Sequence, residues 1–145
     1  MLCFQAYHEI MGTPIIIHRL EPNNQIPFYF TEVEKIFGVI DNIKHLAMLQ
    51  TLFYARLRAS ELCALDDSDL DLRTLSVRIR GDEGERDGMA YITDICTITL
   101  HRYLAIRPSL VIDERKPLFY SDNGQRWNRS SLYRMFALYR KRLES

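Results

Sequence analysis

The chain has 145 residues, of which 47% are hydrophobic and 26% are charged, and its 19 basic and 19 acidic residues cancel to a net charge of zero. This size and composition predict one globular domain with a single core, and the neutral balance favours no class of partner. The sequence contains no apolar run near the roughly 20 residues needed to cross a membrane, and residues 1–9 lack the basic and apolar segments of a signal peptide. We therefore expect a cytoplasmic protein without a membrane partner.

The residue types that bind metals form no recognisable site. Cys3, Cys63 and Cys96 contain no Cys-x-x-Cys pair, which favours reduced thiols over a disulfide framework or a zinc site. The acidic run 66–71 lacks the sixth-position glycine and the closing glutamate of a calcium-binding EF-hand loop, so we interpret it as a turn between a helix and a strand. The sequence also has no phosphate-binding glycine loop. We expect no metal and no cofactor.

The first 29 residues carry little periodic pattern. A helix over 1–11 and a short β-branched run at 15–17 are followed by an irregular connection that contains prolines. We therefore divide the chain into an N-terminal extension or linker, residues 1–29, and a domain, residues 30–145.

Helical patterning begins at Thr31. Thr31 and Glu34 match a capping box, in which the threonine oxygen accepts an N–H and the glutamate reaches back, and apolar residues follow at helical spacing. A leucine stripe predicts a second helix over about 44–55. Ser60 is predicted to be the N-cap of a third, short helix with Glu61 in its first turn.

The second half of the chain mixes strands and helices. Apolar and polar residues alternate over 75–80, as in a half-buried strand, and a charged turn at 81–84 leads to a returning strand over 89–93. The remaining predicted elements are a helix over about 95–106 capped by Asp94, a short strand at 118–120 and a last helix over about 131–143.

Charge is distributed unevenly along the chain. Residues 61–87 carry nine acids against four arginines, whereas residues 125–142 carry six bases and no acid. This asymmetry is typical of a nucleic-acid-binding end or of a solvated helix face, and charge alone favours the solvated face slightly. The six bases are Arg126, Arg129, Arg134, Arg140, Lys141 and Arg142.

Two neighbouring segments carry a family resemblance. Residues 53–65 read FYARLRASELCAL, and residues 69–78 read DLDLRTLSVR, an acidic turn that leads into the first predicted strand. Together they resemble the opening half of the catalytic domain of tyrosine recombinases, the phage integrase family, where the pattern is approximately GLRxSELxxLxxxD. The resemblance implies a mixed α+β, mainly helical fold around a small antiparallel β-sheet. Residues 30–145 would then be a partial integrase-like catalytic domain.

The resemblance implies roles for two residues at the junction between helices. Arg58 would contact the scissile phosphate, where a planar guanidinium can bind two oxygens at once, and Glu61 would orient this arginine from behind. From the residues alone, a cap on the preceding helix or a partner of Glu61 is the favoured interpretation of Arg58. A favourable charge in a first turn explains Glu61 nearly as well as an orienting role does. Arg56 falls where the family has glycine.

Other parts of the family's active site have no match. The hairpin turn at 80–86 places Gly81 or Asp82 where the family has its general-acid lysine, and none of the four histidines begins a His-x-x-Arg motif. Tyr133 and Tyr139 lie on the last predicted helix, and packing is favoured over nucleophilic attack for both. The resemblance therefore leaves catalytic activity open.

We consider three functional hypotheses. The first is an integrase-like protein for DNA recombination and integration, truncated and inactive alone, that retains binding to double-stranded DNA. The second is an interaction protein that forms a homo-oligomer or is completed by a partner chain supplying the missing half. The third is an active recombinase with a nucleophile such as Tyr139. For the first, the expected DNA-binding residues are Arg78, Arg80, Arg86, Arg126, Arg129, Arg140, Lys141 and Arg142.

Overall fold

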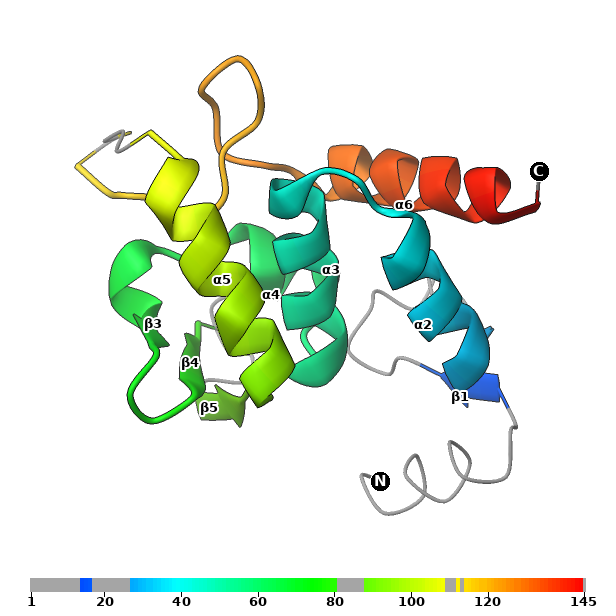
Figure 1. The fold of residues 1–145 in the computed structure, drawn as a ribbon. Coiled ribbons are helices and arrows are strands. Elements are labelled where there is room, and N and C mark those ends of the chain that lie inside the picture. The colour runs from blue at the N-terminus through cyan, green and yellow to red at the C-terminus, as the bar shows by residue number, and fades with distance from the viewer. Residues whose placement is uncertain (1–13, 17–26, 81–87, 109–111, 113, 145) are drawn as a thin grey trace.

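The computed structural model shows helices packed around a small antiparallel sheet, which confirms the predicted mixed α+β, mainly helical class (Figure 1). It describes residues 14–16, 27–80, 88–108, 112 and 114–144. The predicted helix over 1–11, the hairpin turn at 81–84 and Arg86 lie outside the described residues, as does the side chain of Thr31 in the predicted capping box.

The first two helices follow the apolar periodicity of the sequence. α2 (Phe30–Val39) and α3 (Ile43–Tyr54) confirm the two helices expected there. Asn42 caps α3, because its Oδ1 accepts the N–H groups of Lys44 and His45 at 2.9 and 3.2 Å.

α3 ends in a Schellman motif whose left-handed residue is Arg56. The Leu57 N–H donates to the Leu52 carbonyl at 3.1 Å, and the Arg56 N–H donates to the Phe53 carbonyl at 3.3 Å. Arg56 has a φ of 55°, a conformation that costs a residue with a Cβ about 1 kcal/mol or more. The backbone therefore explains why the resemblance places glycine at this position.

The predicted short helix is present, but it starts earlier than expected. α4 (Ala59–Cys63) has Arg58 as its N-cap, so the predicted cap at Ser60 is wrong by two residues. The Glu61 carboxylate accepts the Arg58 N–H at 2.7 Å. A carboxylate that reaches back three residues satisfies an N–H at the helix start whatever the side chain of the capping residue is.

The described residues contain two small antiparallel sheets. β1 (Pro14–Ile16) pairs with β2 (Pro27–Tyr29), which the sequence pattern did not indicate as a strand. The second sheet has the strand order β3 (Leu70–Asp71), β4 (Ser76–Ile79) and β5 (Gly88–Tyr91). The predicted hairpin is therefore confirmed. The acidic run before it forms a short 3-10 helix, η2 (Asp67–Asp69), followed by β3, which confirms the expected turn.

α5 (Asp94–Ile106) confirms the predicted helix before Pro108. Its N-cap is Thr93, whose hydroxyl accepts the Cys96 N–H at 3.2 Å. The predicted cap at Asp94 is thus one residue too late, because the threonine hydroxyl reaches the amide three residues on.

The segment between α5 and the last helix is mostly irregular. The strand predicted at 118–120 is not formed; the segment makes isolated contacts, such as the bond from the Leu118 N–H to the Leu65 carbonyl at 2.9 Å. α6 (Arg129–Glu144) confirms the last predicted helix, and Asn128 accepts the Ser131 N–H at 2.8 Å at its start.

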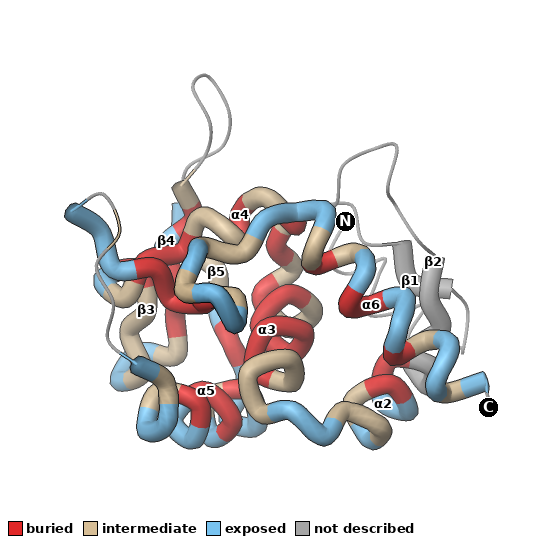
Figure 2. The backbone as a smooth tube through the Cα atoms, turned by 90° about the horizontal axis from the view of Figure 1, so that it is seen from above, coloured by how far each residue is buried: buried red, intermediate tan, exposed pale blue. Residues whose placement is uncertain are grey.

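α3 lies in the middle of the fold (Figure 2). It packs against α5, α4 and α2, and its residues Ala47, Met48 and Leu49 are fully buried. α6 packs its apolar side, which includes Leu132 and Phe136, against α2 and α4. None of the described helices combines the length and apolar character that a membrane crossing requires.

Replacing Arg56 with glycine is expected to raise the free energy of unfolding by about 0.5–1 kcal/mol, because glycine adopts this φ without the cost of a Cβ. Urea unfolding followed by circular dichroism measures the change. The matched control is Arg134→Gly at an exposed position inside α6, which should lower the free energy of unfolding by about 1 kcal/mol. A loss of stability in Arg56→Gly would contradict this account of the turn.

Candidate nucleic-acid interface

Arg58 lies between the end of α3 and the start of α4. Its neighbours Leu57 and Ala59 are fully buried. Its backbone is bonded on both sides, since its N–H donates to Glu61 and its carbonyl accepts the Leu62 N–H at 3.0 Å. The half-buried guanidinium is therefore carried by a rigid junction, which suits the binding of a group with fixed geometry.

Glu61 is buried, and its carboxylate binds the backbone of Arg58. The contact caps the start of α4, and it also fixes the residue that carries the guanidinium. The two interpretations of Glu61, a first-turn charge and an orienting residue, thus rest on the same hydrogen bond. Phosphate binding by Arg58 stays a prediction.

A buried carboxylate joins several segments near the end of α4. Asp66 is 5% exposed, and its oxygens lie 2.6 Å from Arg126, 2.9 Å from Arg115 and 3.5 Å from Arg80. Asp69, also buried, accepts the Arg80 Nε–H and the Asp66 backbone N–H, both at 2.9 Å. We call these five residues the Asp66 network. Because a buried carboxylate is costly without cationic partners, the network holds its segments together.

Arg126 extends this network to the end of α4. Its Nη1 donates to the carbonyls of Cys63 and Leu65, each at 3.1 Å. A helix leaves its last carbonyls without intrahelical donors, and Arg126 supplies one. Arg80 and Arg126, two of the expected DNA-binding residues, are thus bound to protein atoms, and their contact with DNA stays a prediction.

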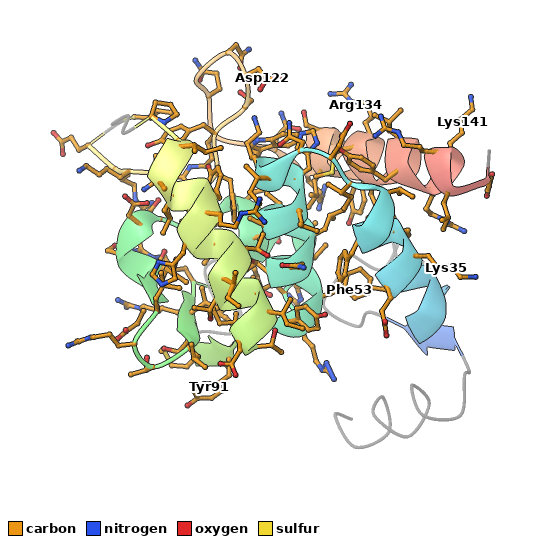
Figure 3. The ribbon with its side chains drawn as sticks, viewed as in Figure 1. Lys35, Phe53, Tyr91, Asp122, Arg134 and Lys141 are labelled. Carbon is orange, nitrogen blue, oxygen red and sulfur yellow. The ribbon has the colours of Figure 1, made fainter. Side chains whose placement is uncertain are left out.

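Further basic residues lie at the surface on β4 and α6. Arg78 on β4 and Arg129 at the start of α6 are both exposed. Arg134 and Lys141 point away from the same side of α6 (Figure 3). Arg134 was not among the expected DNA-binding residues; its spacing of two helical turns from Lys141 is the signal that could have revealed it.

The end of α6 also contacts the connection between α2 and α3. Arg142 lies 3.3 Å from the Asp41 carboxylate, and its guanidinium lies 5.0 Å from the centre of the Tyr139 ring. Of the expected bases at 140–142, Arg140 is half-buried, whereas Lys141 and Arg142 are both exposed and Arg142 also pairs with Asp41.

Tyr139 is buried against α3. Its hydroxyl lies 2.7 Å from His45 Nδ1, and the two rings meet edge to face. Burial raises the pKa of the Tyr139 hydroxyl. Burial also lowers the pKa of His45, and the neighbouring positive charge of Lys44 lowers it further. An enclosed phenol with a raised pKa is a poor nucleophile, so the geometry favours packing as the role of Tyr139.

The two described cysteines are free thiols. Burial raises the pKa of Cys63 to about 12 and the pKa of Cys96 to about 11, so both stay protonated near neutral pH. Within the described ranges, no group of three or more His, Cys, Asp or Glu side chains is placed to hold a metal ion.

The sequence is similar to known recombinases. Residues 28–145 match the family model of the phage integrase family. The tyrosine recombinase XerA of Pyrococcus horikoshii is 34% identical over 89 residues, which are 59% of this chain and 31% of that protein. The tyrosine recombinase XerC of Thermodesulfovibrio yellowstonii is 32% identical over 100 residues, which are 66% of this chain and 33% of that protein.

A solved structure agrees with these sequence matches. The crystal structure of XerA recombinase is similar with a TM-score of 0.72 and 27% identity, over 79% of this chain and 41% of that chain. The chain spans about a third of the length of the two curated relatives that it matches.

Replacing Asp66 with asparagine is expected to lower the free energy of unfolding by about 2–3 kcal/mol, because three guanidiniums lose a shared negative charge. The effect is smaller than for a fully buried pair, since the three arginines are partly exposed. Urea unfolding measures it. The matched control is Asp122→Asn, because the Asp122 carboxylate is fully exposed where it pairs with Lys44. We expect this substitution to change the free energy of unfolding by less than about 1 kcal/mol. Equal effects of the two substitutions would refute this role for Asp66.

Proposed function

This chain belongs to the phage integrase family, and from that premise we propose that it is a recombinase-like protein that binds double-stranded DNA through Arg58 and the outward side of α6. The processes in which it would take part are DNA recombination and integration. Free thiols at Cys63 and Cys96 fit a reducing compartment, so the proposal places the protein in the cytoplasm.

The support for a phosphate contact at Arg58 is the rigidity of its backbone. A guanidinium can donate two parallel N–H bonds to phosphate oxygens, and both bonds form only when the guanidinium plane is correctly oriented. Because Leu57 and Ala59 are buried and the Arg58 N–H and carbonyl are both bonded, little backbone freedom remains to be lost on binding. This is the observation on which the proposal mainly rests.

The support for α6 is the division of its residues between two sides. The inner side buries Leu132, Met135 and Phe136, and Glu144 is the single acid in the helix. The basic residues of α6 therefore give it a positive field, which attracts the phosphate backbone of DNA without reading its sequence.

The Asp66 network supports a fixed spacing between these two contacts. Arg126, just before α6, is bound both to Asp66 and to the carbonyls at the end of α4, and α4 begins directly after Arg58. Two phosphate contacts that keep a constant separation bind a regular duplex better than two that move independently.

We further infer that residues 1–145 alone do not cleave or join DNA. The sequence has no His-x-x-Arg motif and no lysine in the hairpin turn at 80–86. The Tyr139 hydroxyl is enclosed and bonded to His45. Strand transfer by a tyrosine requires an accessible nucleophile and groups that stabilise the charge developing on the phosphate.

Fluorescence anisotropy with a labelled duplex across a salt series tests DNA binding. Affinity should fall steeply with salt, and Arg58→Ala should reduce the slope of log K against log salt by about 1, because one phosphate contact is lost. The Arg134→Ala/Lys141→Ala double variant should reduce it by about 2. Urea unfolding confirms that each variant remains folded.

The matched control is Arg73→Ala, which removes an exposed arginine from the turn before β4. Affinity and salt slope should stay close to those of the wild type. The proposal is wrong if the wild-type chain does not bind duplex DNA at low salt, or if Arg73→Ala weakens binding as much as Arg58→Ala does.

A nicked suicide duplex, which traps covalent protein–DNA intermediates, tests the absence of strand cleavage. We expect no adduct on a denaturing gel with the wild-type chain under conditions where anisotropy shows binding. An adduct that forms with the wild type and disappears in Tyr139→Phe would overturn this inference and favour the third hypothesis. Tyr133→Phe is the matched control, because Tyr133 lies on the same helix.

A further inference from the structure

Four large hydrophobic side chains are exposed around the start of α5. Met89 and Tyr91 on β5 are 55% and 69% exposed, and Ile95 and Ile98 on α5 are 59% and 61% exposed. Single exposed apolar residues are normal on a protein surface, but four within ten residues mark an interaction surface. We call these four residues the α5 patch.

The α5 patch is not needed to hold α5 on the protein. The opposite side of the helix buries Cys96, Leu100 and Tyr103, and α5 packs against α3. Ile95 and Ile98 are β-branched residues that lose side-chain freedom in a helix without gaining burial in return. α5 lies in front of the other elements in Figure 1 and along the lower edge in Figure 2, so no other described element covers its outer side.

Two exposed charges lie on the same outward side of α5. Asp94 precedes Ile98 by four residues and Arg102 follows it by four, so the three residues lie along one side of the helix. The order along the helix is therefore acid, apolar, base. Such a surface is complementary to itself in one orientation only. Two antiparallel copies pair each Asp94 with the other copy's Arg102, whereas two parallel copies oppose like charges.

We propose that the α5 patch is a self-association surface that binds a second copy of this chain, with the two α5 helices antiparallel about a twofold axis near Ile98. In this arrangement Ile98 of each copy meets Ile98 of the other, and the surface is the same on both, as a twofold interface requires. Exposed ion pairs such as Asp94 with Arg102 contribute little energy but select the orientation. The contact is small, so the dimer should be weak, with a dissociation constant in the micromolar range or above.

Self-association at this surface leaves the basic side of α6 accessible to DNA. Tyr91, in the α5 patch, lies at the opposite side of the molecule from Arg134 and Lys141 (Figure 3). The inference is independent of DNA binding, because it rests on exposed apolar residues and a charge pattern that are separate from Arg58 and α6.

Sedimentation velocity over a concentration series tests the proposal in the absence of DNA. The wild-type chain should shift from monomer to dimer as concentration rises, and Ile98→Glu should weaken the association at least tenfold by placing two like charges at the axis. The matched control is Leu138→Glu on α6, a residue that is 52% exposed outside the α5 patch, and it should dimerise like the wild type. Ile98→Glu should still bind DNA as the wild type does, which separates failure of this inference from failure of the proposed function.

Charge reversal tests the antiparallel orientation and does not depend on apolar residues. Asp94→Lys and Arg102→Glu should each weaken association several-fold, because each places like charges together. The double variant Asp94→Lys/Arg102→Glu restores the complementary order and should recover most of the wild-type association. A wild-type chain that stays monomeric at the highest soluble concentration would overturn the proposal, and so would a double variant weaker than both single variants.

Discussion

The ion pairs of the Asp66 carboxylate hold together the segments that follow α4. Its three arginine partners come from the end of β4, from the segment before Pro117 and from the segment before α6. Arg126 alone spans 60 residues of sequence to reach it. If the carboxylate were lost, Arg126 would remain beside the carbonyls of Cys63 and Leu65 without this counter-charge, and Arg80 would keep only Asp69. The carboxylate in turn would be unstable in the interior without its arginine partners. The short helix that carries Arg58 therefore has its far end held by ionic contacts as well as by apolar packing.

This network explains how a chain with no net charge can present a positive helix. The acids that follow α4 are used inside the protein: Asp66 and Asp69 bind Arg80 and Arg126, and Asp67 binds Arg107. Arg107 also donates to the Pro117 carbonyl at 2.9 Å. Internal arginines are thus neutralised by nearby acids, while the outward bases of α6 have few acids on their own helix. The uneven charge along the sequence reflects this separation in part, because Glu61, Asp66, Asp67 and Asp69 are all bonded within the protein.

The sequence predicted those features that depend on near neighbours in the chain. α3 and α6 were found because an apolar residue every three or four positions is a local pattern, and the hairpin was found from alternation. Helix starts were less accurate, since Ser60 and Asp94 are good capping residues by type whereas the caps are Arg58 and Thr93. The strand expected at 118–120 failed because a strand needs a partner elsewhere in the chain, and this segment has one bond to Leu65 and isolated bridges. For the same reason, no local pattern could show that Arg126 binds Asp66 and the end of α4.

The one-sided packing of α6 has a consequence for how the protein opens. α3 is enclosed by other helices, so its amides are expected to be released only when the whole domain unfolds, whereas α6 packs along one side, mainly on α2 and α4 and on α3 through Tyr139 and Phe136. A helix held along one side can detach at a lower free energy than global unfolding, and its arginines detach with it. The element that we propose to contact DNA is therefore also the first part of the core expected to fray. Bound DNA would then hold α6 in place, and DNA affinity would respond to small losses in the packing of Leu132 and Phe136 long before the fold itself is lost.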